Sequence, residues 1–124
     1  MTACPCGRPD VARCCGPYLD DFEGYPAPGA EALMRSRYSA FVLQRADYLL
    51  ATWHPSTRPH DLTFEPGLKW LGLEVRDVRQ AAADQAEVEF VARSRLAGRG
   101  HRLHERSRFV REDGRWYYVD GDLK

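Results

Sequence analysis

The spacing of apolar side chains changes once along this chain, from a helical period to a strand-like period. Residues 30–52 contain neither Gly nor Pro, and apolar positions there recur at helical intervals. One helical face would carry Ala30, Met34, Tyr38, Phe41, Tyr48 and Thr52. We expect one long helix, or two nearly continuous helices with Asp47 capping the second.

Strand-like alternation begins after a loop at residues 53–66 that contains three prolines. Apolar and polar residues then alternate over 71–76, 88–96, 103–110 and 116–120, which indicates strands with one buried face. Turns at 98–100 and 112–115 separate the later strands, and Asp113-Gly114 is a strong hairpin signal. The pattern predicts an α+β fold, in which a helix packs on a curved antiparallel sheet of about four strands in meander order.

Size and charge narrow the classes of protein to which this chain can belong. Its 124 residues suffice for one core, and 18 Lys and Arg residues balance 18 Asp and Glu residues. A net charge of zero argues against a nucleic-acid-binding protein that works by bulk attraction, although it does not exclude a local basic patch. No apolar run approaches the roughly 20 residues of a membrane span, and the N-terminus lacks the features of a secretory signal. We expect a cytoplasmic protein.

All four cysteines lie within residues 4–15, and the rest of the chain contains none. Disulfides that stabilise small proteins join distant segments, whereas these cysteines can close only one short loop. Thiolates are the preferred ligands of a structural zinc ion, and the candidate Zn²⁺ ligands are Cys4, Cys6, Cys14 and Cys15. A reduced tail with free thiols and a local disulfide are the alternatives.

The distribution of Cys, Pro and Gly predicts three parts. Residues 1–17 form a zinc knuckle, residues 18–29 a linker with two Pro and two Gly, and residues 30–124 the α+β domain. Because the α+β domain has its own core, we expect a chelator to unfold the knuckle and to leave the rest folded.

Short segments along nearly the whole chain resemble known families. The SEC-C motif, the zinc knuckle at the C-terminus of the translocation motor SecA, is similar to Cys-Pro-Cys-Gly at 4–7 followed by Cys-Cys-Gly-Pro at 14–17. The YchJ-like family of bacteria is similar in the segments 33–41, 48–49, 52–55, 104–109 and 116–121.

These resemblances imply a SEC-C knuckle, with all four cysteines on zinc, joined to a domain of the nuclear-transport-factor-2-like (NTF2-like) fold. That fold is a cone of curved sheet and helices shared with ketosteroid isomerase, and it agrees with the helix and meander predicted above. One departure is the loop between the cysteine pairs, which has seven residues here in place of the usual eight. Of the basic residues typical of that loop, only Arg8 and Arg13 remain.

Cone-shaped domains often enclose a pocket, so polar residues that point inward are candidate site residues. In the strand 103–109 the apolar ends place Glu105 and Ser107 on the inner face, and Asp77 shares the parity of Val75. The helical side adds Arg35, Arg37, Tyr38, Trp53 and His54. A carboxylate, a guanidinium and a phenol around one cavity are able to bind a small polar ligand or to transfer a proton.

A structural role is the favoured alternative for Glu105. A buried ion pair with Arg35 or Arg37 would anchor the helix to the sheet and would keep Glu105 ionised at pH 7. The chain has no phosphate loop, nucleotide fingerprint or pair of nucleophile and base.

Three functions are compatible with these features. The favoured one is interaction with another protein through the zinc knuckle, because closed tetrathiolate sites are structural and not catalytic. The second is small-molecule binding or catalysis in the cavity. The third is an accessory role at the ribosome or translocon, which the SEC-C resemblance alone implies. Alternating Arg and Glu residues make the outer sheet face a candidate surface for a homodimer.

The cysteine cluster predicts one zinc ion per chain. Protein purified without added metal should contain close to one equivalent by metal analysis, because four thiolates complete a tetrahedral site. Less than about a tenth of an equivalent, together with four freely reactive thiols, would contradict this prediction.

Overall fold

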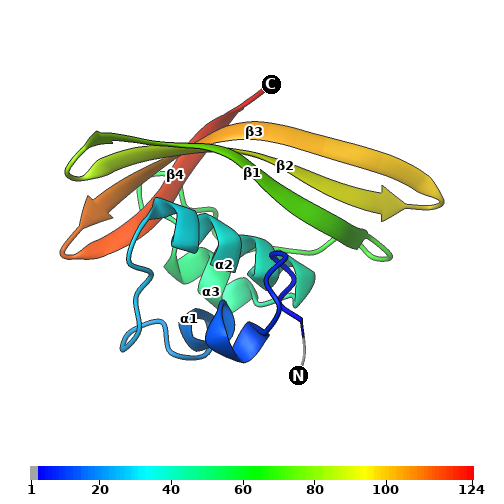
Figure 1. The fold of residues 1–124 in the computed structure, drawn as a ribbon, viewed down its shortest axis with the longest axis horizontal. Coiled ribbons are helices and arrows are strands. Elements are labelled where there is room, and N and C mark those ends of the chain that lie inside the picture. The colour runs from blue at the N-terminus through cyan, green and yellow to red at the C-terminus, as the bar shows by residue number, and fades with distance from the viewer. Residues whose placement is uncertain (1–2) are drawn as a thin grey trace.

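Helices cover one face of a single antiparallel sheet, which arches over them (Figure 1). The computed structural model describes residues 3–124. Its elements in chain order are η1 (Val11–Arg13), α1 (Gly16–Asp20), α2 (Ala30–Val42), α3 (Ala46–Ala51), β1 (Lys69–Ala82), β2 (Gln85–Leu96), β3 (Arg99–Glu112) and β4 (Arg115–Leu123). The strands pair in the order β1-β2-β3-β4, so the expected α+β meander is confirmed.

Tight hairpins connect β2 to β3 and β3 to β4. The φ angles are 52° and 79° at Ala97 and Gly98, and 51° and 78° at Asp113 and Gly114. Two successive positive φ angles are typical of a type I′ turn, whose twist matches that of the flanking strands. The Asp113-Gly114 turn lies where the sequence predicts it. The earlier turn lies before its predicted place, so that β3 already begins at Arg99.

Bulges in β1 change which side chains face the helices. Pairing between β1 and β2 shifts register at three places, one of them between Val75 and Asp77. Arg76 is the extra residue there, so the alternation reverses after it. Asp77 therefore lies on the outer face, where its Oδ2 accepts from Arg106 Nη2 at 2.7 Å. The inward placement predicted from the parity of Asp77 is wrong.

A sharp C-terminal cap divides the helical region into two helices. Gln44, just beyond α2, has a left-handed φ of 57°. Its amide donates to the carbonyl of Phe41 at 3.3 Å, and the amide of Arg45 donates to the carbonyl of Ala40 at 2.8 Å. These are the two bonds of a Schellman motif, which commonly uses glycine at this position. The predicted cap at Asp47 is wrong, because Arg45 occupies that position without a side-chain capping bond.

The segment 18–29, expected as a linker, packs against the rest of the chain. α1 runs across its beginning, and Leu19 belongs to the common core. Arg115 of β4 donates from Nη1 to the carbonyl of Phe22 at 2.7 Å, and Arg45 donates from Nη2 to the carbonyl of Leu19 at 2.8 Å. Two guanidinium groups from distant parts of the sequence thus hold this segment, which differs from a free linker.

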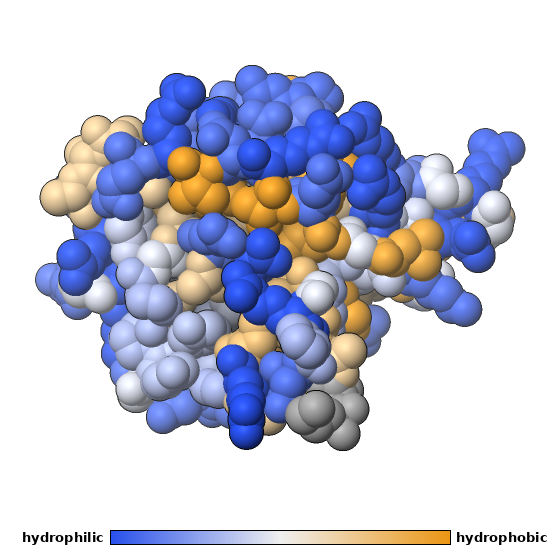
Figure 2. Space-filling model, viewed as in Figure 1, coloured by the Kyte–Doolittle hydropathy of each residue, from blue (hydrophilic) through white to orange (hydrophobic). Residues whose placement is uncertain are grey.

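One core joins the knuckle, the helices and the sheet. Its buried members include Cys4, Cys6, Cys15, Leu33, Tyr38, Tyr48, Leu49, Val88, Phe90, Ala92 and Phe109. Seen from outside, apolar residues form a band along the junction of sheet and helices, beneath a largely hydrophilic layer on the sheet (Figure 2). Within residues 3–124, no helix combines the length and the apolar composition needed to cross a membrane.

Packing of α3 can be tested with two leucines. Leu49 on α3 is fully buried, whereas Leu43 just beyond α2 is 49% exposed. Leu49→Ala should lower the free energy of unfolding by about 2–5 kcal/mol because it leaves a cavity, and Leu43→Ala should change it by no more than roughly 0.5 kcal/mol. Urea unfolding measures both values. Equal midpoints for the two variants would contradict the described packing of α3.

Candidate functional site

Four cysteine thiols meet in the knuckle at distances suited to one metal ion. The Sγ atoms of Cys4, Cys6, Cys14 and Cys15 lie within 4.8 Å of one another, and all four cysteines are free. Cys14 Sγ lies 3.5 Å from Cys6 Sγ and 3.8 Å from Cys15 Sγ. A tetrahedral site with Zn–S bonds of about 2.3 Å would separate its sulfurs by about 3.8 Å. The four residues therefore fit a metal ion in tetrathiolate coordination.

Glycines allow the backbone to bring the two cysteine pairs together. Gly7 has a φ of 108° directly after Cys6, and its amide donates to the carbonyl of Cys4 at 3.0 Å. This reversal needs a residue without a Cβ. Gly16 follows the second pair, and a Cβ there would lie 2.7 Å from the carbonyl oxygen of Val11. Both turns were visible in the sequence as glycines beside cysteines.

Crowding of the thiols moves their pKa values apart. A hydrogen bond from Cys15 lowers the pKa of Cys6 to about 4, against the opposing effect of burial. Burial raises the pKa of Cys14 to about 11, and a hydrogen bond with Cys6 raises the pKa of Cys15. Without a metal, Cys6 is thus favoured as the thiolate, whereas Cys14 and Cys15 keep their protons. A bound dication would displace those protons, since the thiolate is the metal ligand.

The knuckle packs directly on α2. Cys4, Cys6 and Cys15 are at most 3% exposed, and Cys4 Sγ lies 3.6 Å from Ser39 Oγ. Arg35 donates from Nη1 to the carbonyl of Cys6 at 3.2 Å. Arg35 thus places a positive charge beside the thiolates. The sequence predicts Arg35 in the pocket, and this placement is wrong.

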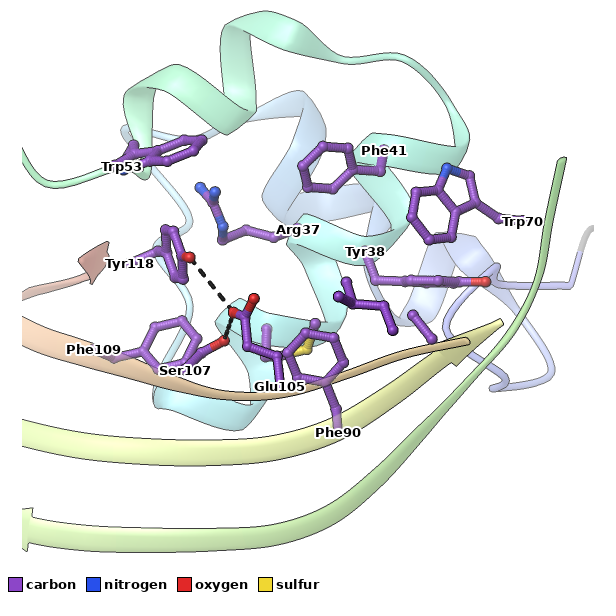
Figure 3. A pocket seen from close by; sticks show the side chains of 13 residues that line it. Arg37, Tyr38, Phe41, Trp53, Trp70, Phe90, Glu105, Ser107, Phe109 and Tyr118 are labelled. Atoms are coloured by element: carbon purple, nitrogen blue, oxygen red, sulfur yellow. Dashed lines mark hydrogen bonds between the residues drawn. The ribbon is translucent and has the colours of Figure 1, made fainter. Parts of the chain in front are cut away.

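A second candidate site is a cavity of about 260 Å³ between α2 and the inner face of the sheet. Figure 3 shows its polar groups, from Arg37, Glu105, Ser107 and Tyr118, close together on one side. Its remaining walls are largely apolar and include Met34, Phe41, Trp70, Phe90, Ala92 and Phe109. An apolar cavity with a few convergent polar groups is the usual composition of a small-molecule site.

Five of the eight predicted pocket residues line this cavity, namely Arg37, Tyr38, Trp53, Glu105 and Ser107. The other three lie elsewhere. Arg35 contacts the knuckle, and Asp77 is on the outer sheet face. His54 bonds Ser56 through Nδ1 at 2.7 Å, and its ring lies edge-on to Tyr117.

Arg37 is the buried cation of the cavity and is 5% exposed. Its Nη1 donates to the carbonyl of Leu49 at 2.8 Å and to Thr52 Oγ1 at 2.6 Å. The guanidinium carbon lies 5.1 Å from the ring centre of Trp53 and 4.7 Å from that of Tyr118, within cation–π range. Burial lowers the pKa of Arg37 to about 10, so the group stays charged at neutral pH.

Glu105 is held by hydroxyl groups and not by an ion pair. Ser107 Oγ and Tyr118 Oη both donate to Glu105 Oε2, the latter at 3.5 Å. Within the described residues no ion pair joins Glu105 to Arg35 or Arg37, so the predicted anchor is wrong. Burial and the nearby Glu105 raise the pKa of Tyr118 to about 12, so the phenol keeps its proton and stays a donor.

Tyr118 is the site residue that the sequence does not single out. Its amide donates to the carbonyl of Thr52 at 2.8 Å, and its carbonyl accepts from the amide of His54 at 2.7 Å. This pairing of β4 with the end of α3 brings Tyr118 against Trp53, with ring centres 5.1 Å apart. The strand pattern marks Tyr118 only as one aromatic residue among three neighbours, so tertiary contact alone distinguishes it.

Comparison with known proteins identifies relatives along the whole chain. A family model described as "YchJ, middle NTF2-like domain" matches residues 29–121. A UPF0225 protein of Polaromonas naphthalenivorans is 66% identical over 134 residues, which cover 98% of this chain and 97% of that protein. A UPF0225 protein of Methylibium petroleiphilum is 65% identical and covers 97% of this chain and 88% of its own length.

Two solved structures share the fold. The solution structure of a SEC-C motif containing protein from Rhodopseudomonas palustris has a TM-score of 0.83 at 33% identity and covers 99% of this chain and 98% of that one. The crystal structure of a SEC-C motif containing protein from Psychrobacter arcticus has a TM-score of 0.83 at 30% identity and covers 100% of this chain and 84% of that one. The resemblances to the SEC-C motif and to the YchJ-like family are confirmed.

Removal of metal should destabilise the whole protein, because three of the four cysteines belong to the common core. A strong chelator should lower a single melting transition by about 10 °C, equivalent to roughly 2 kcal/mol. The variant Cys6→Ser/Cys15→Ser should melt at this lower temperature and should not respond to the chelator. Two transitions, of which the upper one ignores the chelator, would instead support the separable knuckle that the Pro- and Gly-rich segment suggests.

Proposed function

This chain belongs to the YchJ-like UPF0225 family, and from that basis we propose that it is a small-molecule-binding protein stabilised by a structural zinc ion. The observation that carries the proposal is the cavity of about 260 Å³, which combines apolar walls with a buried guanidinium and a carboxylate. Proteins bind small ligands in sites of this composition.

Zinc is the metal that the donor set favours. Cys4, Cys6, Cys14 and Cys15 would hold it, and soft thiolates select zinc over magnesium or calcium. Four protein ligands leave no coordination position for a substrate, so the ion would cross-link the N-terminal segment and take no part in chemistry. The knuckle and the cavity also use different residues of α2, since Ser39 faces the cysteines whereas Arg37, Tyr38 and Phe41 line the cavity.

The size of the cavity supports a ligand-binding role. An engineered cavity of 150 Å³ takes benzene, so a space of about 260 Å³ has room for a small aromatic ligand. Two charged groups lie in otherwise largely apolar walls, which is the composition of sites that bind small ligands.

Protein recognition by the knuckle is the second candidate function. A groove of about 620 Å³ lies beside the cysteines and is lined by Arg8, Arg13, Tyr18, Tyr25 and Arg35, among others. Tyr25 is 50% exposed there. Aromatic and Arg side chains are enriched in protein interfaces, which favours a protein partner, with ribosomal or translocon factors as the class that the SEC-C resemblance implies.

Filling the cavity tests the proposed function. Ala92 faces the cavity from β2, and Ala83 lies in the exposed turn between β1 and β2. Naphthalene should bind the unmodified protein. Quenching of tryptophan fluorescence measures this binding, because Trp53 and Trp70 line the cavity. Ala92→Phe should weaken binding at least about tenfold by occupying the space, whereas the control Ala83→Phe should bind as the unmodified protein does.

Equal binding of naphthalene by Ala92→Phe and by the unmodified protein would contradict a ligand cavity. Native mass spectrometry of the two variants, purified from the cells that produce them, addresses the second candidate. A protein partner retained by both variants, with no small molecule retained by Ala83→Phe, would favour recognition by the knuckle.

A further inference from the structure

The two charged groups of the cavity each keep unused hydrogen-bonding atoms. Arg37 and Glu105 reach the same end of the cavity, Arg37 from α2 and Glu105 from β3 (Figure 3). A site that leaves donors and acceptors free at fixed positions selects its ligand by the complementary pattern. The unpaired donors and acceptors of these two residues therefore indicate which polar atoms the ligand carries.

Arg37 offers free donors. Among residues 3–124 its partners are the carbonyl of Leu49 and Thr52 Oγ1, both bonded to Nη1, so Nε and Nη2 stay available. Donors that stay without a partner inside a binding site weaken the complex, so this end of the cavity favours an acceptor on the ligand.

Glu105 offers a free acceptor. Ser107 and Tyr118 both donate to its Oε2, and Oε1 has no partner among the described residues. The side chain sits over Gly121 of β4, where a Cβ would come within 2.8 Å of Glu105 Cγ. The missing side chain at Gly121 thus makes the space in which the carboxylate is held. The ligand should donate a proton to Oε1.

Charge and shape restrict the ligand further. The guanidinium and the carboxylate balance each other, so a charged ligand would leave a net charge in an apolar cavity, which is costly. Aromatic rings of Tyr38, Phe41, Trp70 and Phe90 line the walls and favour a flat ring system. An engineered cavity of 150 Å³ takes benzene, so about 260 Å³ suits a ligand of about ten non-hydrogen atoms.

We infer that the cavity binds a flat, uncharged bicyclic aromatic compound whose edge carries an N–H beside a C=O, as in a lactam. This inference rests on the proposed function. The carbonyl oxygen of the ligand would accept from Arg37, and its N–H would donate to Glu105 Oε1. A hydrocarbon of the same shape would leave Glu105 Oε1 and the remaining N–H groups of Arg37 without partners, and an anion would face the carboxylate.

Four probes of nearly one shape test the ligand class by isothermal titration calorimetry. The lactam isoquinolin-1(2H)-one should bind at least about tenfold more tightly than each of the other three probes, which are naphthalene, the N-methyl derivative of the lactam, and 1-naphthoate. The lactam alone bonds both Arg37 and Glu105 without adding charge. In Glu105→Gln the lactam should lose about tenfold, naphthalene should be unchanged, and 1-naphthoate should gain at least about tenfold because Arg37 is then unbalanced.

The outcomes separate this inference from the proposed function. If naphthalene binds but the lactam binds no more tightly, or if 1-naphthoate binds best to the unmodified protein, the ligand class is overturned and the cavity function stands. If none of the four probes binds, both are overturned. The N-methyl comparison needs no variant, so it decides the role of the ligand N–H even if Glu105→Gln fails to fold.

Discussion

The buried guanidinium of Arg37 is the contact on which the arrangement of helices and sheet depends. It donates to the carbonyl of Leu49 and to Thr52 at the end of α3, and it lies against the rings of Trp53 and Tyr118. One side chain of α2 thereby holds the chain where it leaves the helices and where β4 crosses them. A cation is tolerated there because carbonyl, hydroxyl and aromatic groups replace water around it.

The N-terminal knuckle extends this core and closes the other side of α2. Its cysteines are buried against Ser39, and Arg35 sets a positive charge next to them. The following segment is fixed by Arg45 and Arg115, whose guanidinium groups satisfy backbone carbonyls that no helix or strand would satisfy. A metal ion at the cysteines would complete this closure, because it would displace the thiol protons and join all four sulfurs.

The cysteine cluster and the cavity contact different residues of α2, so the two sites do not overlap. Four cysteine ligands would complete the tetrahedral shell of a metal ion, and none of them lines the cavity, so the proposed small-molecule site is the space lined by Arg37 and Glu105. The hydroxyl groups of Ser107 and Tyr118 hold one oxygen of that carboxylate, and no residue in 3–124 bonds the other. Membership of the family establishes the fold, and the free atoms of the cavity carry the argument about its occupant.

The sequence by itself determined the fold class, the Asp113-Gly114 hairpin and the cysteine cluster, because helical period, strand alternation and turn residues act between near neighbours. Tertiary structure decided the rest of the site. An extra residue at Arg76 turned Asp77 outward, and the pairing of β4 with the end of α3 brought Tyr118 to Glu105. Alternation cannot predict either outcome, since a bulge and a long-range pairing depend on how the sheet bends around the helices and not on local sequence.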